Sequence, residues 1–238
     1  MGLPDPAPIL LRALPAKGQR GMNILVVSDM VDPRLDSLEV ARRFSSASLL
    51  LSCGDLPYAY LEYIVSMLNC PMFFVRGNHD PRTAGPPAYQ LLAPQGGQDL
   101  HRRVVNHNGL LLAGVEGSLR YREGDFQYTQ EEMWLHVYGL LPYLLYNKAR
   151  YGRYLDIFIS HAPPQGIHDL PDPAHQGLWA FRWLVERFQP ALFFHGHVHK
   201  YQHSAPCETT LGRCRVINVY GYTCVNWDEP PVRSRTRD

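Results

Sequence analysis

Short apolar runs alternate with segments of helical periodicity in the N-terminal third of this 238-residue chain, and this alternation constrains the fold most strongly. MNILVVSD (22–29), ASLLLSCGD (47–55) and PMFFVRGNHD (71–80) are rich in branched or aromatic apolar residues, as buried strands are. LDSLEVARRFSS (35–46) has helical spacing, and PYAYLEYIVSMLN (57–69) opens with a proline suited to a helix start. Strands that are apolar on both faces and joined by helices predict βαβ units with parallel pairing.

The middle of the chain carries two local signals. An Asn-Gly pair at 108–109 between two short apolar runs predicts a hairpin turn. Thr129 and Glu132 form a capping-box pattern. This pattern predicts a long helix that runs towards Lys148 with a kink at Pro142.

The remaining segments complete one domain. Buried strands are predicted at residues 154–161 and 191–199, a helix at 174–188 and a hairpin at 203–222. We therefore divide the chain into a disordered or extended segment over residues 1–21, one domain over 22–225 and a polar tail over 226–238.

Charge and composition exclude several classes of protein. The chain has 23 Lys and Arg against 22 Asp and Glu, so no basic field predicts a nucleic-acid or membrane surface. No apolar run approaches the ~20 residues that span a bilayer. The N-terminus lacks the basic start of a secretory signal, and Arg12 interrupts its apolar patch. Five cysteines without a CxxC pair favour free thiols and a cytoplasmic protein, with a bridge between Cys207 and Cys214 as the alternative.

Ligand-type side chains occur where each predicted strand ends. They are Asp29, Asp55, Asn78, His79, His161, His197 and His199. Ligands of an α/β sheet bind beyond the carboxyl ends of its strands, so these residues should converge on one edge. Singly, an aspartate there is more often a cap or turn former, and a histidine a core residue. Together, these carboxylate, amide and imidazole donors predict a site for manganese, iron or zinc.

The order of these residues resembles the calcineurin-like metallophosphoesterase superfamily, whose signature is Asp-x-His, Gly-Asp, Gly-Asn-His-Asp or Glu, a lone His, and Gly-His-x-His. The matching segments are SDMV (28–31), CGDL (53–56), RGNHD (76–80), SHAPP (160–164) and HGHVH (195–199). The resemblance covers nearly the whole chain. It implies an α/β fold, a four-layer αββα sandwich of two mixed β-sheets flanked by helices.

The resemblance also implies one or two divalent or trivalent transition-metal ions. By it, Asp55 bridges two ions. The second site is completed by Asn78, His161 and His197, and the first site has Asp29 and His199.

Two further residues receive catalytic roles from the resemblance. His79 faces the substrate and stabilises developing charge or protonates the leaving oxygen. Asp80 orients the His79 ring or favours its charged form. His195 matches no ligand position and is expected to pack against or support the others.

The first motif departs from the family pattern, because Val31 stands where the family has histidine. Valine cannot ligate a metal, so we expect a full second site and a weakened first site. Asp32 follows by one residue, but strand alternation points it to the opposite face. Other branches of the superfamily vary this histidine and some of them are enzymes, so the change does not imply inactivity.

The implied activity is hydrolysis of a phosphate mono- or diester by attack of a metal-activated water. A non-catalytic scaffold or binding protein of the same fold is the alternative, typically after loss of the substrate-facing histidine or several ligands. Because His79 and most ligand positions are present, we favour a phosphodiesterase or phosphatase.

Candidate substrate contacts lie outside the motifs. The loop after His161 is similar to one in a branch that contains cyclic-nucleotide-type phosphodiesterases, and it offers His168, Asp169 and His175. Its Pro and Gly residues are also compatible with a purely structural loop. Arg76 precedes the GNHD motif and either contacts phosphate or lies solvated. The expected substrate is small and phosphorylated, a nucleotide being one candidate.

The segment 130–150 carries apolar and aromatic residues on more than one helical face. Such a stripe is most often core. The apolar and aromatic residues beyond those that one buried face needs predict a homodimer interface or a lid over the site.

Overall fold

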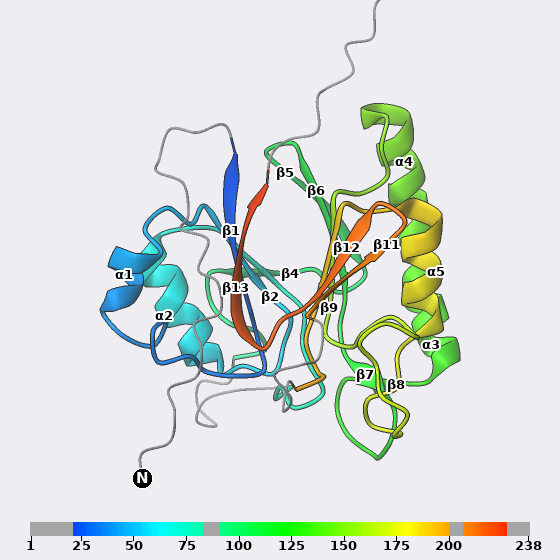
Figure 1. The fold of residues 1–238 in the computed structure, drawn as a ribbon, viewed down its shortest axis with the longest axis horizontal. Coiled ribbons are helices and arrows are strands. Elements are labelled where there is room, and N and C mark those ends of the chain that lie inside the picture. The colour runs from blue at the N-terminus through cyan, green and yellow to red at the C-terminus, as the bar shows by residue number, and fades with distance from the viewer. Residues whose placement is uncertain (1–20, 83–90, 200–206, 228–238) are drawn as a thin grey trace, which may run out of the picture.

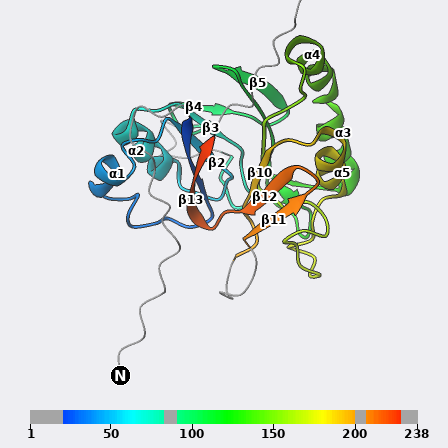
Figure 2. The ribbon, with the colours of Figure 1, turned by 45° about the horizontal axis from the view of Figure 1, so that its top comes forward.

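Two β-sheets pack face to face, with helices on both outer sides (Figures 1 and 2). The computed structural model describes residues 21–82, 91–199 and 207–227. This arrangement confirms the predicted four-layer αββα sandwich of two mixed sheets.

The first sheet has the strand order β13-β1-β2-β3-β4. Its strands are β1 (Met22–Ser28), β2 (Leu49–Ser52), β3 (Met72–Phe74), β4 (Gly97–Asp99) and β13 (Gly221–Trp227). β1 to β4 pair in parallel, and β13 is antiparallel to β1. The parallel strands end at one edge of the sheet, as the βαβ pattern predicts.

The second sheet has the order β11-β12-β10-β9-β6-β5. Its strands are β5 (Arg103–His107), β6 (Leu110–Val115), β9 (Ile157–Ser160), β10 (Leu192–His195), β11 (Glu208–Leu211) and β12 (Cys214–Asn218). The four central strands are parallel, while β5 and β11 pair antiparallel at the two edges. A small parallel pair, β7 (Ser118–Leu119) and β8 (Gln127–Tyr128), lies outside both sheets.

Five helices cover the outer faces in the part of the chain that the structure describes. They are α1 (Glu39–Arg43), α2 (Tyr58–Leu68), α3 (Gln130–Tyr138), α4 (Leu141–Tyr151) and α5 (Trp179–Phe188). α1 and α2 lie against the first sheet, and α3, α4 and α5 against the second (Figure 2). Strand alternation explains the apolar run of β1, because Ile24 and Val26 face the other sheet while Leu25 and Val27 face the helices.

The predicted long helix over 129–148 is wrong, because the chain forms two helices there. The capping box of Thr129 and Glu132 is present at the start of α3, but α3 ends at Tyr138. Pro142 stands in the first turn of α4. Proline is well tolerated there because the N–H that it lacks has no partner within the helix, so the residue starts a helix instead of kinking one.

Smaller differences concern element ends. The helix predicted from residue 174 begins only at Trp179, and β13 continues to Trp227, so the sheet includes the first two residues of the predicted tail. The rest of the predicted terminal segments, residues 1–20 and 228–238, lies outside the described residues. Cys207 and Cys214 are free thiols, not a bridge.

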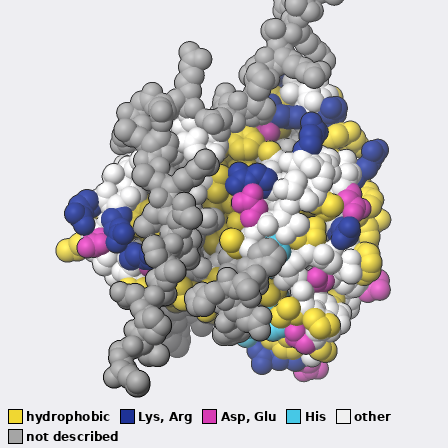
Figure 3. All heavy atoms as spheres, viewed as in Figure 1, with side chains coloured by type: hydrophobic (Ala, Val, Ile, Leu, Met, Phe, Trp, Pro, Cys, Tyr) yellow, Lys and Arg dark blue, Asp and Glu magenta, His cyan; other side chains and the backbone are white. Residues whose placement is uncertain are grey.

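Two further features of the molecule are the distribution of charge on the surface and the length of the helices. Basic and acidic side chains are interspersed over the face seen in Figure 3. Among the described residues, no helix is both long enough and apolar enough to cross a bilayer.

Candidate metal centre

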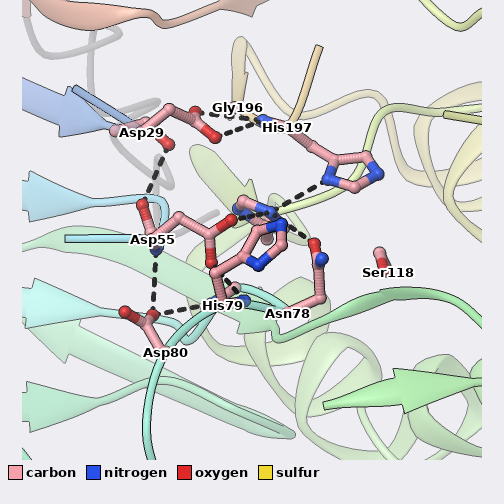
Figure 4. A network of polar contacts seen from close by, with 12 residues as sticks. Asp29, Asp55, Asn78, His79, Asp80, Ser118, Gly196 and His197 are labelled. Atoms are coloured by element: carbon pink, nitrogen blue, oxygen red, sulfur yellow. Dashed lines mark hydrogen bonds and ion pairs between the residues drawn. The ribbon is translucent and has the colours of Figure 1, made fainter. Parts of the chain in front are cut away.

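The loops that follow the parallel strands of both sheets bring the ligand-type residues together. Asp29 follows β1, Asp55 lies beyond β2, and Asn78 lies beyond β3. His161 follows β9 and His197 lies beyond β10. Figure 4 shows Asp29, Asp55, Asn78 and His197 turned towards a common space. The convergence predicted from the sequence therefore occurs across two sheets, at the edge where the strands end.

Two glycines make this approach possible. A methyl group on Gly77 would lie 2.5 Å from Cγ of Asp55 and 2.7 Å from Cε1 of His161. A methyl group on Gly196 would lie 2.9 Å from Cβ of Ser28, and closer still to the Asp29 carboxylate. Any side chain at these positions would displace a ligand-type residue.

Three of the ligand-type residues adopt a left-handed backbone conformation. Asp29, Asp55 and His197 have φ angles of 62°, 58° and 68°. Such residues cost about 1–3 kcal/mol each unless their surroundings hold them, and they cluster at functional sites. Here the Asp29 N–H donates to the carbonyl of Gly54 at 3.2 Å, and the His197 N–H donates to both carboxylate oxygens of Asp29 at 3.1 and 3.0 Å.

A group of oxygen and nitrogen atoms surrounds Nε2 of the fully buried His161. Oδ2 of Asp55 lies 3.2 Å away, Oδ1 of Asn78 lies 3.0 Å away, and Nδ1 of His197 lies 3.1 Å away. These four residues are the ones that the family resemblance assigned to the second site.

The partners of the two imidazoles indicate which of their nitrogens bear protons. Nδ1 of His161 lies 2.8 Å from the carbonyl of Cys53, and Nε2 of His197 lies 2.6 Å from the carbonyl of Ala174. Each of these nitrogens must donate, because a carbonyl only accepts. In the neutral rings, the lone pair of His161 Nε2 then faces the oxygens of Asp55 and Asn78 and the lone pair of His197 Nδ1. Four electron-pair donors directed at one another require a cation, so the residues fit a metal ion, and the carbonyl partners match the usual support of metal-bound histidines.

The charges of the cluster show the same demand for a cation. Burial alone lowers the pKa of His161, but the negative charges of Asp55 and Asp29 outweigh it and raise the pKa to about 9. Burial alone raises the pKa of Asp55, but the neighbouring His161 outweighs it and lowers the pKa to about 2. His197, buried beside His161, has its pKa lowered to about 3. In the metal-free centre a proton on His161 therefore supplies the positive charge.

Asp29 belongs to a second, overlapping group of ligand-type residues. Asp29, Asp55 and His161 each offer a ligand atom within 4.8 Å of the others. His199 adds Nε2 at 3.5 Å from Oδ1 of Asp29. Val31 is 38% exposed and offers no ligand atom.

Asp32 does not replace the missing histidine. Its buried carboxylate forms a two-pronged pair with Arg34, at 2.9 and 2.6 Å. Asp32 lies beyond the end of β1, so this pairing with Arg34, and not strand alternation, keeps it out of the cluster.

His79 and Asp80 occupy different surroundings. His79 is exposed beside the cluster, and its N–H donates to Oδ1 of Asp55 at 2.8 Å. The buried carboxylate of Asp80 accepts the N–H groups of Asp55, Leu56 and Gly77 at 3.0, 3.2 and 2.7 Å. Burial, together with the charge of Asp55, raises the pKa of Asp80 to about 6. The Asp80 carboxylate therefore ties the loops of Asp55 and Gly77 together, and its role in orienting or charging His79 stays a prediction.

Arg76 is also placed differently from the expected phosphate contact. Its guanidinium donates to Asp99 at 2.7 Å and to Glu116 at 3.3 Å, and only 13% of its side chain is exposed. This internal ion pair supports the loop that begins at Gly77.

The three candidate substrate contacts in the loop after His161 have different surroundings. His175 lies against His197, with ring centroids 5.2 Å apart. Asp169 accepts the N–H groups of Gly166 and Gly177 at 3.0 and 3.2 Å, so it shapes the loop. His168 has both ring nitrogens engaged, with His195 at 3.0 Å and Thr209 at 2.9 Å.

Some supporting groups had no signal in the sequence. The hydroxyl of Tyr121 lies 3.3 Å from Nδ2 of Asn78 and accepts its N–H, which turns Oδ1 of Asn78 towards His161. The carbonyls of Cys53 and Ala174 hold the two imidazoles. Backbone carbonyls have no residue signature, and Tyr121 stands outside every motif.

Residues 22–201 match the model of the calcineurin-like phosphoesterase family. An uncharacterized protein of Haemophilus influenzae is 27% identical over 169 residues, which cover 63% of this chain and 72% of that protein.

Solved structures show the same fold. The crystal structure of TT1561 of Thermus thermophilus is 18% identical, with a TM-score of 0.52 over 87% of this chain and 99% of that one. Another crystal structure is 15% identical, with a TM-score of 0.58 over 87% of this chain and 95% of that one. At these identities the likeness concerns the fold alone.

Proposed function

Because the chain belongs to the calcineurin-like phosphoesterase family, we propose that it is a metal-dependent hydrolase of a small phosphate mono- or diester. The observation that carries this proposal is the meeting of Asp55, Asn78 and His197 around Nε2 of His161, within 3.2 Å. Manganese, iron or zinc suits this donor set. When bound, the ions would neutralise phosphoryl oxygens and lower the pKa of a coordinated water towards 7.

His79 is the proposed acid of the reaction. Its backbone N–H is fixed on the Asp55 carboxylate, while its side chain is exposed beside the cluster, where a bound ester would lie. From there the imidazole can donate a proton or hydrogen bond to the leaving oxygen. General acid catalysis of this kind contributes roughly 10²–10⁴-fold to the rate.

The test uses nitrophenyl phosphate mono- and diesters with manganese. His79→Ala should lower kcat by at least about 100-fold and leave the metal content unchanged. His107→Ala, on the edge strand β5, is the matched control and should keep full activity. Full turnover by His79→Ala would refute the role of His79. A wild-type protein that binds both ions but hydrolyses no ester in a broad panel would favour the competing proposal, a non-catalytic binding protein.

The first site is proposed to be weaker than the second. Val31 contributes no ligand, whereas the second site keeps Asn78, His161 and His197 around Asp55. Val31→His should therefore retain a second metal equivalent during dialysis against a chelator. Met30→His is the control, because Met30 is adjacent to Val31 and is exposed to a similar degree, 36% against 38%. Two equivalents that survive chelation in the wild type would contradict the proposal.

A pocket next to the centre is the proposed seat of the organic part of the substrate. It has a volume of about 380 Å³. The residues that line it are Gln130, Gln165, Asp169, Leu170, Pro171, Gln176, Gly177 and Trp179. The ring of His175 lies 5.2 Å from that of His197. Gly177 stands two residues after His175, so at most about 7 Å of backbone separates Gly177 from His175.

The lining favours a flat heteroaromatic group such as a nucleobase. The indole of Trp179 is 53% exposed and offers a stacking surface, while the glutamines offer both donors and acceptors. Stacking of a base on an aromatic side chain contributes about 1–3 kcal/mol. Trp179→Ala should raise KM for a nucleoside phosphate ester by about tenfold and leave KM for a glycerol phosphate ester unchanged. An equal effect on both esters would contradict the nucleotide proposal.

The exposed face of α3 and α4 is the proposed contact with a second copy of the chain. Leu135, Tyr138, Tyr143, Leu145 and Tyr146 are between 46% and 66% exposed there. An apolar surface of this kind is typical of interaction sites. The alternative of a lid does not fit α4, which lies at the end of the molecule away from β7 and β8, the strands next to the centre (Figure 1).

The compartment proposed for the protein is the cytoplasm. Cys53 and Cys214 are buried free thiols, which are typical of a reducing environment. Nucleic acid and membranes are not proposed as partners, because charges of both signs are interspersed over the face seen in Figure 3.

A further inference from the structure

We propose that Thr209, His168 and His195 form a hydrogen-bond chain that positions the Asp29 carboxylate for the first metal site. The chain reaches Asp29 through the peptide group between Gly196 and His197. The inference rests on the metal centre proposed above, and it concerns positioning residues, not groups that touch the substrate.

The direction of each hydrogen bond follows from its acceptor. Nδ1 of the fully buried His195 lies 3.0 Å from the carbonyl of Gly196, so it donates. Nε2 of the neutral ring is then an acceptor, and it lies 3.0 Å from Nδ1 of His168, which donates. Nε2 of His168 accepts in turn, at 2.9 Å, from the hydroxyl of Thr209 on β11. The three groups therefore form one consistent chain from an edge strand into the core.

The chain ends on a peptide group whose other side touches a metal-ligand candidate. The carbonyl of Gly196 and the N–H of His197 belong to one planar unit, so fixing the carbonyl fixes the direction of the N–H. This N–H donates to both carboxylate oxygens of Asp29, at 3.1 and 3.0 Å. His197 has a φ of 68°, a conformation that persists only where neighbours enforce it.

Asp29 needs this support more than its counterpart in a complete site would. Val31 offers no ligand to the proposed first site, so an ion there would depend on Asp29 and Asp55 and on the imidazoles of His161 and His199 beside them. A carboxylate already held in position loses less conformational freedom when it binds an ion. The hydrogen-bond chain thus partly compensates for the missing histidine. The second site gains less, because His161, Asn78 and the ring of His197 have other supports, namely the carbonyls of Cys53 and Ala174 and the hydroxyl of Tyr121.

The simpler interpretation is that His168 and His195 only satisfy each other inside the fold. It predicts that their loss lowers stability and affects both metal sites alike, or neither. Positioning of Asp29 predicts a selective loss at the weaker site. The two interpretations are therefore separated by metal binding measured site by site.

The experiment titrates the metal-free full chain with cobalt(II) and follows both binding heat and the visible absorption of the bound ion. His168→Gly removes the ring without strain at a backbone φ of 62°. His168→Asn keeps a donor at the position of Nδ1 and tolerates the same φ. Thr209→Val removes only the outermost donor, and the exposed Thr210→Val on the same strand is its control.

His168→Gly should weaken the weaker cobalt equivalent by about 10–100-fold and leave the tighter one nearly unchanged. His168→Asn should recover most of this loss, Thr209→Val should show a smaller loss, and Thr210→Val none. Parallel loss at both sites, or unchanged binding in His168→Gly, would overturn the inference. Because the readout is metal binding, a wild type that binds cobalt but hydrolyses no ester would refute only the proposed activity. A wild type that binds no cobalt would refute both.

Discussion

Replacing Gly77 by alanine tests the geometry of the metal centre most directly. The added methyl group would lie 2.5 Å from Cγ of Asp55 and 2.7 Å from Cε1 of His161. Carbon atoms in ordinary contact lie about 3.5–4.0 Å apart, so the carboxylate or the ring must move by about 1 Å. Gly77 is not among the residues with a positive φ, so alanine adds crowding without backbone strain.

A displacement of this size is decisive for a metal ligand. Metal–ligand distances are defined to within about 0.2 Å, so Asp55 would leave the position from which it is proposed to bridge two ions. Loss of supporting groups alone costs about 10–100-fold in metal affinity, and displacing a ligand should cost at least the upper value. Overpacking of this kind lowers the free energy of unfolding by only about 1–3 kcal/mol, which a domain of this size can tolerate.

The assay is calorimetric titration of metal-free protein with manganese, with thermal unfolding followed by circular dichroism. Gly139→Ala is the matched control, because a methyl group there meets nothing closer than the carbonyl of His136 at 3.3 Å. We expect Gly77→Ala to remain folded and to lose at least about 100-fold in affinity at both sites. A folded Gly77→Ala protein that binds both ions as tightly as the wild type would refute the bridging role of Asp55.

Three further predictions concern metal uptake and assembly. Asp55 and Asp29 raise the pKa of His161 to about 9 in the metal-free centre, so an incoming ion must displace a proton there. Metal affinity should therefore rise by about tenfold per pH unit between pH 6 and 8. Calorimetry in buffers of different ionisation heat should show that about one proton is released per ion bound. An affinity that is independent of pH would contradict this prediction. Tyr121→Phe removes the hydroxyl that orients Asn78, so it should lower the metal affinity of the tighter site by about tenfold in the same titration. An unchanged affinity would show that the Asn78 amide needs no such support. If copies associate through α4, replacing Leu145 and Tyr146 together by Glu should yield monomers in light scattering. The control is Leu38→Glu, which changes an exposed apolar residue away from α4 and should not yield monomers. A wild type that is monomeric at high concentration would refute the contact.

Much of the fold could be predicted because its signals are local. The apolar residues of β1 alternate between two cores, so the strand reads as apolar throughout. The Asn-Gly pair at 108–109 joins β5 and β6, and the capping box at Thr129 starts α3. Pro142 was misinterpreted because proline both kinks and starts helices, and only the packing around it decides between the two.

The ligand set could be predicted for a related reason. Asp29, Asp55 and His161 follow strands, and parallel strands deliver their carboxyl ends to one edge whatever else the chain does. Residue type and position along each strand therefore sufficed to collect them. Val31 offers no ligand because its side chain has no donor atom, and Asp32, which lies beyond the end of β1, pairs with Arg34 instead.

Side-chain partners across the fold could not be read in this way. Arg76 pairs with Asp99 and Glu116, and His168 lies between His195 and Thr209, which is 41 residues away in sequence. The identity of a polar side chain states what it can donate or accept, but not which group will face it. The sequence by itself determined the sheets, their common edge and the kinds of donor gathered there. Only the tertiary structure decided that His168 hydrogen-bonds to His195 and Thr209, because hydrogen bonds act over about 3 Å and those distances are set by the packing of the whole fold.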